Sequence, residues 1–232
     1  MSKEYPEIRT YSKNTELVAE RRKEIMQKAI AVFLEKGYSA TTLRDISLAC
    51  GVSVGNIYRY IGSKDDILHL LCLARSNSRE GLENIVIEKK DANVIELLKA
   101  CIRYHFAVGD QSRMYNMFFN REISHFSLDD RRVLLASQIT VINFFKELLE
   151  KGIRNGDFQM RSTTAVAHNI LMLGHDWGLR YWYLSRIFTL EEYTGIQIEL
   201  ILKQISCNSV ASDTTTKCEQ TVIKEYPGLS SQ

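Results

Sequence analysis

Proline is scarce in this chain, with only two in 232 residues. No stretch alternates apolar and polar residues as half-buried strands do. Leu, Ile, Glu, Lys and Arg are abundant, and these residues favour helices. The sequence therefore predicts an all-α protein. Its 45% of hydrophobic residues suffice for one large core, or for one core and a small appended module.

Long apolar runs are also missing. Charged residues interrupt every apolar stretch well before the roughly 18 residues that a membrane span requires. The first ten residues, MSKEYPEIRT, show no apolar signal-peptide region. We therefore expect a cytoplasmic protein without a membrane partner.

The cysteines are not spaced as metal ligands or as a disulfide framework. Their number is odd and no two form a C-x-x-C pair. We expect no metal site, and we interpret the thiols as buried or incidental, with a redox-sensing cysteine as the alternative. They are Cys50, Cys72, Cys101, Cys207 and Cys218.

Net charge is low overall but unevenly distributed. Between Ile8 and Arg75 there are eleven Lys and Arg residues against seven Asp and Glu, an excess of four, whereas the whole chain carries only +2. The remainder is therefore net acidic. An electropositive N-terminal module on a near-neutral body suits a polyanionic partner.

Caps and glycines divide residues 14–62 into three helices. Apolar residues at helical spacing predict a first helix over 16–36, which ends at Gly37. Thr42 with Asp45 forms a capping box for a short helix that ends at Gly51, and Ser53 caps a third helix over 54–60. Three helices of these lengths, with a glycine between the second and third, match a helix-turn-helix.

Longer helices are expected beyond this module. Ser63 with Asp66 opens a fourth helix, and further helices are predicted over 92–108, 111–119, 127–154, 163–185 and 190–206. We assign 1–13 to a flexible N-terminus, 14–62 to a DNA-binding domain and 63–206 to a helical ligand-binding and dimerisation domain. The polar, Ser- and Thr-rich segment 207–232 is expected to be a disordered tail.

The third helix carries the residues that a recognition helix needs. Such a helix presents polar side chains to the major groove, where Arg59 can pair with guanine, Asn56 with adenine and Val54 with a thymine methyl. Tyr58 and Thr42 suit phosphate oxygens, and Lys64 adds its charge at the start of the next helix. The alternative is that Asn56, Tyr58 and Arg59 belong to an ordinary solvent-exposed helix face without a specific role. The predicted DNA-binding residues are Thr42, Arg44, Ser53, Val54, Gly55, Asn56, Tyr58, Arg59, Tyr60 and Lys64.

The block GYSATTLRDISLACGVSVGNIYRYIGSKDDIL resembles the DNA-binding domain of the TetR family of bacterial transcriptional regulators. The matching positions are Gly37, Tyr38, Thr41, Thr42, Ile46, Gly51, Val52, Ser53, Gly55, Ile57, Tyr58, Ser63, Lys64 and Leu68. Two positions depart from the usual pattern: Val54 stands where lysine is frequent, and Arg59 where histidine is frequent. An operator sequence therefore cannot be transferred from the family.

The resemblance implies nine or ten helices, a homodimer through the last two long helices, a palindromic DNA operator and a body that holds a small-molecule effector. In the last helix, Tyr193, Ile196, Leu200 and Ile201 form an apolar stripe. The helix before it carries another stripe, made of Ile170, Leu173, Trp177 and Leu184. Ordinary core packing is the alternative to a four-helix dimer interface for both stripes.

Effector-binding candidates combine aromatic side chains with isolated polar groups, as apolar cavities do. They are Tyr104, His105, Phe118, Phe119, Arg121, Glu122, His168, His175, Trp177 and Arg180. Core packing is the alternative for the aromatic residues. His168 and His175 lie seven residues apart, but a metal would need a third ligand that the sequence does not place.

Three C-terminal stretches resemble the family members that respond to fatty-acyl or aromatic coenzyme A thioesters. They are FFNREISHFSLDDRR, KGIRNGDF and WGLRYWYLSRIFTLEEYTGIQIELIL. The resemblance implies an apolar tunnel with a basic residue such as Arg121 or Arg180 near its mouth for the phosphates.

The sequence thus predicts a ligand-responsive repressor that needs neither cofactor nor catalysis. One alternative is an enzyme on a helical bundle, for which His105, His168, His175, Glu122 and Asp176 are the only candidates and have no recognised spacing. The other is a structural DNA-binding protein without a ligand, which the long C-terminal body disfavours.

Overall fold

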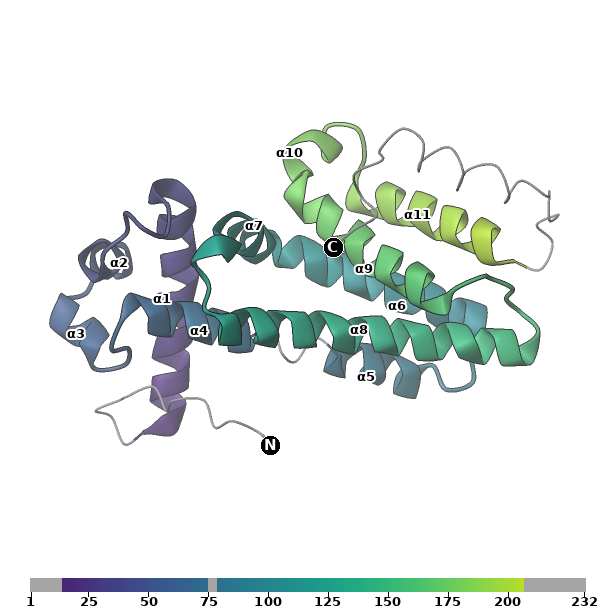
Figure 1. Cartoon of the computed structure of the whole chain (residues 1–232), viewed down its shortest axis with the longest axis horizontal. Coiled ribbons are helices and arrows are strands. Elements are labelled where there is room, and N and C mark those ends of the chain that lie inside the picture. The colour runs from purple at the N-terminus through teal and green to yellow at the C-terminus, as the bar shows by residue number, and fades with distance from the viewer. Residues whose placement is uncertain (1–13, 75–78, 207–232) are drawn as a thin grey trace, which may run out of the picture.

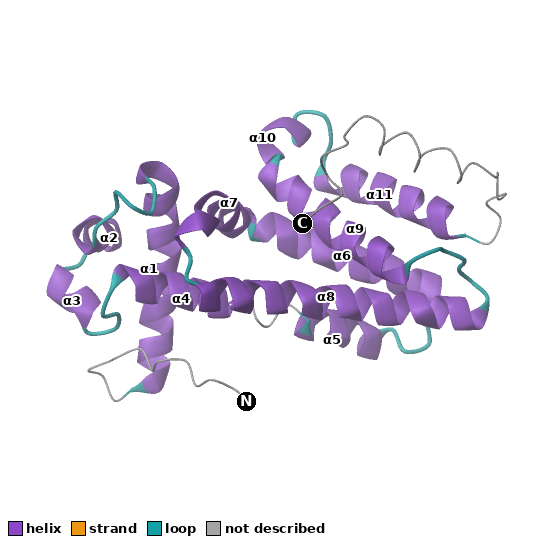
Figure 2. Ribbon diagram, in the orientation of Figure 1, coloured by secondary structure: helices purple, strands orange, loops and turns teal. Residues whose placement is uncertain are grey.

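The computed structural model describes residues 14–74 and 79–206, and the predictions for 1–13, for 207–232, for Cys207 and for Cys218 lie outside this part. Helices joined by loops make up the described residues, apart from one isolated bridge between Phe158 and Ser206 (Figure 2). The helices are α1 (Thr15–Lys36), α2 (Leu43–Cys50), α3 (Val54–Tyr58), α4 (Lys64–Ala74), α5 (Glu80–Glu88), α6 (Val94–Gln111), α7 (Arg113–Glu122), the 3-10 turn η1 (Ile123–His125), α8 (Leu128–Asn155), α9 (Thr163–Leu179), α10 (Tyr181–Leu184) and α11 (Leu190–Ile205).

The molecule is elongated, with α1–α4 at one end and α5–α11 forming the rest (Figure 1). We call the first part the head and the second the body. Helix α8 runs along most of the body, and α3 lies at the outer end of the head (Figure 1). No helix of the described part is both long and apolar enough to cross a bilayer.

The caps predicted at Thr42, Ser53 and Ser63 are confirmed, and Ser127 and Thr189 cap α8 and α11 in the same way. The hydroxyl oxygens of Thr42, Ser53, Ser63, Ser127 and Thr189 each accept a hydrogen bond from the backbone amide three residues later. These bonds satisfy amides that a helix leaves without a partner at its N-terminus. Because side-chain chemistry alone specifies such caps, the helix starts were readable from the sequence.

Three features of the helices differ from the prediction. Helix α3 ends at Tyr58, two residues early, and the single helix expected over 163–185 is divided between α9 and α10. The division lies at Arg180, whose backbone (φ −107°, ψ 19°) leaves the helical region and brings the Tyr181 ring against Trp177 and Arg113. Helices α5 and α10 raise the number of described α helices to eleven, above the nine or ten expected.

Two clusters of buried apolar residues hold the molecule together. One fills the body and joins α6, α8, α9 and α11. The other fills the head but also takes Phe118 and Phe119 from α7 and Leu134 from α8. Packing therefore crosses the boundary predicted between 62 and 63, and α7 belongs to the core of the head as well as to the body.

Phe118 is a buried apolar contact between α7 and the head. Its ring is fully buried and stacks on Phe33 of α1 with centroids 5.3 Å apart. Replacing Phe118 with alanine should lower the free energy of unfolding by about 3–5 kcal/mol, since it removes a large buried ring and leaves a cavity. Urea unfolding measures the change. The neighbouring Met117→Ala is the control, because Met117 is 42% exposed, and equal losses in both variants would contradict the assignment.

Candidate functional site

A tight turn between α2 and α3 sets the geometry of the head. Gly51 ends α2 in the left-handed conformation (φ 69°, ψ 26°), which glycine adopts without steric cost. Ser53 then starts α3, and its hydroxyl accepts from the Asn56 amide at 3.2 Å. Ile46 and Ile57 are fully buried and attach the two helices to the core of the head. This arrangement fixes the outer surface of α3.

The predicted DNA-binding residues fall into three groups by exposure. Thr42, Arg44, Ser53, Gly55, Tyr58 and Arg59 are exposed, and Val54, Asn56 and Lys64 are half-buried. Asn56 borders a shallow groove together with Arg21 and Glu24 of α1. Tyr60 is buried at 8% exposure. The outer end of the head therefore presents hydrogen-bonding side chains from both α2 and α3.

Two of these residues have internal roles. Because α3 ends at Tyr58, the chain turns Tyr60 into the core, which corrects its assignment as a DNA contact. The Lys64 ammonium donates hydrogen bonds to the carbonyl oxygens of Tyr38 (2.6 Å) and Thr41 (3.0 Å), and lies over the Tyr38 ring. Lys64 thus stabilises the loop between α1 and α2.

An ion pair fixes α2 against the end of α1. The Lys36 ammonium lies 2.6 Å from Asp45 Oδ1, and Asp45 also accepts from the amide and hydroxyl of Thr42. Hydrogen bonds from Lys36 and Thr42 hold the pKa of the Asp45 carboxyl well below its ordinary value. The carboxylate therefore stays ionised and keeps both the capping box and the pair with Lys36.

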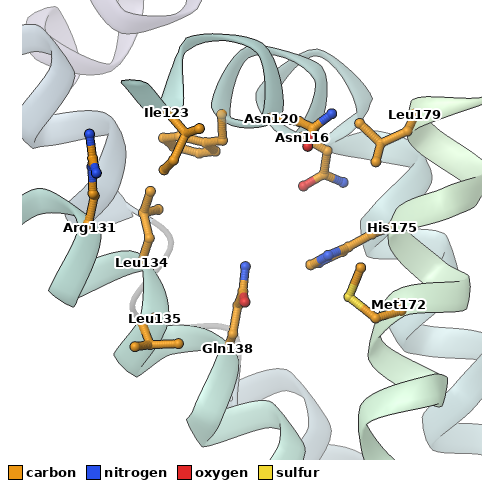
Figure 3. A pocket seen from close by; sticks show the side chains of 11 residues that line it. Asn116, Asn120, Ile123, Arg131, Leu134, Leu135, Gln138, Met172, His175 and Leu179 are labelled. Carbon is orange, nitrogen blue, oxygen red and sulfur yellow. The ribbon is translucent and has the colours of Figure 1, made fainter. Parts of the chain in front are cut away.

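The body contains a cavity of about 310 Å³, which we call the outer cavity, between α7, α8 and α9 (Figure 3). Its apolar wall comes from all three helices, while Arg131 is its one positively charged lining residue within the described part. The lining residues are Asn116, Phe119, Asn120, Ile123, Arg131, Leu134, Leu135, Gln138, Met172, His175 and Leu179.

A second cavity, of about 230 Å³, adjoins the first, and we call it the inner cavity. Asn116, Gln138 and His175 line both cavities, and in Figure 3 these three side chains point into the space between the helices. Four of the nine other residues that line the inner cavity come from α6, and all nine except Ala74 are buried or half-buried. The two cavities therefore adjoin, and these three polar side chains lie at the boundary between them.

Four of the ten predicted effector-binding residues line these two cavities. Tyr104 and His105 face the inner cavity, Phe119 the outer cavity, and His175 both. The His105 and His175 ring centroids are 6.2 Å apart. No three His, Cys, Asp or Glu residues within 14–74 and 79–206 gather as metal ligands would.

The other six candidates lie elsewhere. Phe118 is part of the head core, and Trp177 is buried with its indole N–H donating to Asp110 at 2.7 Å. His168 and Arg180 are exposed, and Arg180, which follows the end of α9, pairs with Asp176 of that helix. These four residues line neither cavity, because each is taken up by core packing or lies on an outer helix face.

Arg121 and Glu122 connect the body to the head instead of lining a cavity. The Arg121 guanidinium donates to the carbonyl oxygens of Leu34 (2.7 Å) and Phe33 at the end of α1, and to Glu122 Oε1 (2.8 Å). Carbonyl oxygens at a helix C-terminus carry partial negative charge and attract cations. Arg121 therefore does not stand at the mouth of a tunnel, as the sequence suggested.

A second connection joins α4 to α8. His69 Nδ1 lies 2.7 Å from Asp130 Oδ1, and both side chains are largely buried. Asp130 also accepts from the hydroxyl of Ser127, the N-cap of α8. The head is therefore attached to the body by polar contacts through α4 and α7, in addition to the apolar contact of Phe118.

Sequence reasoning missed several residues of the cavity wall, namely Asn116, Asn120, Arg131, Gln138 and Met172. Three of them are amides on amphipathic helices, where a polar residue is usually read as solvent-exposed. Only the positions of three neighbouring helices show that they converge. The available signal was Gln138, a polar residue between the apolar positions of α8.

Two family models match the chain. Residues 25–71 match the model described as bacterial regulatory proteins, tetR family, and residues 91–186 match a tetracyclin repressor-like C-terminal domain. The first match covers the helix-turn-helix, and the second covers most of both cavity walls.

Named relatives extend the match over most of the chain. The HTH-type transcriptional regulator HbdR of Aromatoleum sp. (strain CIB) is 30% identical over 202 residues, which is 84% of this chain and 85% of the relative. The HTH-type transcriptional repressor KstR2 of Rhodococcus jostii (strain RHA1) is 27% identical over 168 residues, 70% of this chain and 79% of the relative.

Solved structures share the fold. A tetR-family regulatory protein from Rhodococcus RHA1 matches with a TM-score of 0.70 and 24% identity, over 81% of this chain and 98% of that one. AibR in complex with isovaleryl coenzyme A and operator DNA matches at 0.64 and 19%, over 78% and 97%. FadR from Bacillus subtilis in complex with stearoyl-CoA matches at 0.63 and 22%, over 78% and 98%.

Proposed function

Because the chain belongs to the TetR family of bacterial regulatory proteins, we propose that it is a homodimeric repressor, released from its operator by a coenzyme A thioester. The protein is a DNA-binding transcriptional regulator and not an enzyme. The main support for release by an effector is that α7 forms a wall of the outer cavity and also packs into the head. A repressor of chromosomal genes would act in the cytoplasm.

In this proposal the outer face of α3 reads the DNA. Arg59 pairs with a guanine, Asn56 with an adenine, and Val54 contacts a thymine methyl, while Tyr58 and Thr42 bind phosphate oxygens. The exposure of Tyr58 (47%) and of Arg59 supports these roles. One recognition helix per subunit suffices, because a twofold dimer reads two half-sites of a palindrome.

Helices α9 and α11 would form the dimer interface. The stripe on α11 divides: Tyr193 and Ile201 are buried in the body, whereas Ile196 and Leu200 are 42% and 55% exposed. Met172 of α9, which also lines the outer cavity, is likewise 41% exposed. Exposed apolar residues one helical turn apart are favourable in a four-helix interface, where a second copy removes them from water.

The cavity would hold the thioester with its nucleotide part outward. AibR and FadR, which share this fold, were crystallised with isovaleryl coenzyme A and stearoyl-CoA. Arg131 lines the exposed end of the outer cavity, where a guanidinium can pair with phosphate oxygens. We therefore assign phosphate binding to Arg131 and not to Arg121 or Arg180, which the sequence suggested.

Binding would release DNA by changing the position of α7 relative to α1. A ligand shifts a conformational equilibrium only as far as its affinities for the two states differ. A 100-fold preference for the state that does not bind DNA corresponds to about 2.7 kcal/mol, which is within the usual range of coupling free energies. Phe118 and Arg121, and His69 on α4, provide the contacts that such a movement would displace.

Fluorescence anisotropy tests the proposal with DNA from the region upstream of the protein's own gene. The wild-type protein should bind this DNA, and a panel of coenzyme A thioesters should include at least one that lowers the affinity tenfold or more. Free coenzyme A is the control. DNA binding that is independent of sequence would contradict operator recognition, and DNA binding that no thioester weakens would contradict the proposed effector.

Arg121→Ala should weaken the response to effector without removing effector binding. The substitution deletes the donor to the Phe33 and Leu34 carbonyl oxygens but changes no residue of either cavity wall. In allosteric proteins an effector typically changes the affinity for the second ligand by about 5–150-fold. We expect the ratio of the DNA affinities without and with thioester to fall by about threefold or more. Anisotropy with and without thioester measures it. Arg132→Ala is the matched control, since Arg132 is exposed and pairs with Asp129 of its own helix. The same ratio of DNA affinities in both variants would contradict the coupling role of Arg121.

A further inference from the structure

The boundary between the two cavities is polar. Asn116 of α7, Gln138 of α8 and His175 of α9 each line both cavities and converge from three sides (Figure 3). Each amide offers two N–H donors and a carbonyl oxygen with two acceptor sites, more than one protein partner can satisfy. A ligand that passes from the outer cavity to the inner one must therefore cross a ring of hydrogen-bonding groups.

Hydrogen-bonding groups continue into the inner cavity. Tyr104, His105, Ser112 and Ser137 line it, and no Asp, Glu, Lys or Arg does so among the residues that the structure describes. His105 fits against α9 because residue 174 is glycine: a Cβ there would lie 2.9 Å from His105 Nε2. The inner cavity thus suits a neutral oxygen-bearing group, whereas the charged side chain of Arg131 lies in the outer cavity.

The volume of the inner cavity limits the size of that group. A water molecule occupies about 30 Å³ of the liquid, and a methylene group is of similar size, so 230 Å³ holds roughly eight non-hydrogen atoms. A butanoyl or a benzoyl group meets this limit. A stearoyl chain exceeds it and would place apolar methylenes against the polar ring.

We propose that the inner cavity selects a compact acyl group that carries a hydroxyl or keto oxygen, and that Gln138 is a specificity-determining residue. This inference rests on the proposed thioester effector and names its acyl class. An acyl group without the oxygen displaces water from the polar wall and makes no hydrogen bond to replace those of the water. Sites built to hydrogen-bond a ligand oxygen therefore reject analogues that lack this oxygen. We expect at least a tenfold difference in affinity between matched acyl groups.

Isothermal titration calorimetry of the full chain with matched thioesters tests this inference. The pairs are butanoyl-CoA with 3-hydroxybutanoyl-CoA and benzoyl-CoA with a hydroxybenzoyl-CoA, and stearoyl-CoA is the long-chain member. At least one oxygenated thioester should bind tenfold or more tighter than its matched partner and tighter than stearoyl-CoA. Equal affinity within both pairs, or tightest binding of stearoyl-CoA, would overturn the inference but leave the thioester site in place. Failure of all five to bind would overturn the proposed thioester effector as well.

Gln138→Leu should reduce the preference for the oxygenated thioester to threefold or less, because leucine keeps the approximate size and removes the amide. Asn143→Leu is the matched control on the same helix, since Asn143 is exposed and lines neither cavity. Unchanged DNA binding without effector shows that each variant is folded. His175→Phe serves as a second variant if Gln138→Leu does not fold. If a folded Gln138→Leu variant keeps the full preference for the oxygenated thioester, Gln138 does not determine specificity. If a folded His175→Phe variant keeps it, the three polar residues between the cavities do not.

Discussion

Replacing Tyr58 and Arg59 together with alanine should lower the affinity for operator DNA about 100-fold or more while the dimer remains intact. A good bidentate contact to a base provides about 1–3 kcal/mol of discrimination, and a dimer makes each contact twice. Both side chains are exposed at the outer end of the head, so their loss should not disturb the core. Anisotropy with upstream DNA measures the affinity, and sedimentation equilibrium the dimer.

The matched control for this experiment is Arg154→Ala, at the far end of α8, where Arg154 is also exposed. The variant removes a positive charge without touching the head, so its affinity should change little. The single variant Arg59→Ala adds a test of role, because loss of a base contact relaxes specificity at one operator position. Equal affinities of the double variant and the wild type would refute the contact assignment.

Aspartate at both Ile196 and Leu200 should convert the dimer to a monomer and abolish tight binding to a palindromic operator. Both side chains are exposed in the single chain, so the variant should fold. An interface between α11 helices, however, would bury carboxylates without partners, which is strongly unfavourable. A monomer makes only half of the DNA contacts. Native mass spectrometry gives the assembly state directly.

Ile87→Asp on α5 is the control for the dimer prediction. Ile87 is 70% exposed, and α5, which carries it, lies across the body from α11 in Figure 1. An aspartate there replaces one exposed apolar side chain with a carboxylate, as each substitution of the test variant does, without affecting the proposed interface. If the Ile196 and Leu200 variant stayed dimeric, the interface would have to lie on another surface.

The head was largely predictable because its structure is determined locally. Thr42, Ser53 and Ser63 specify helix starts through their own side chains, and Gly51 specifies the turn through its backbone freedom. Tyr60 was assigned to the DNA surface because its direction depends on where α3 ends. That end is set by packing of the chain beyond Tyr58, and no local signal marks it.

The cavity was predicted less well because it depends on how distant helices pack. Phe118 and Arg121 have the composition of a ligand site, yet they contact Phe33 and Leu34, more than eighty residues away in the chain. Gln138 looks like an exposed position until α7 and α9 are placed beside α8. Residue type alone cannot separate a ligand contact from a contact between head and body, since both need aromatic and cationic side chains.

Hydroxyl-radical footprinting on the DNA upstream of the gene tests most directly whether two copies of α3 read one operator. Two protected segments with twofold-related sequences should appear, with their centres separated by one or more helical turns of about 34–36 Å. Adding an effective thioester should remove both together. A single protected segment, or diffuse protection without sequence preference, would contradict the account.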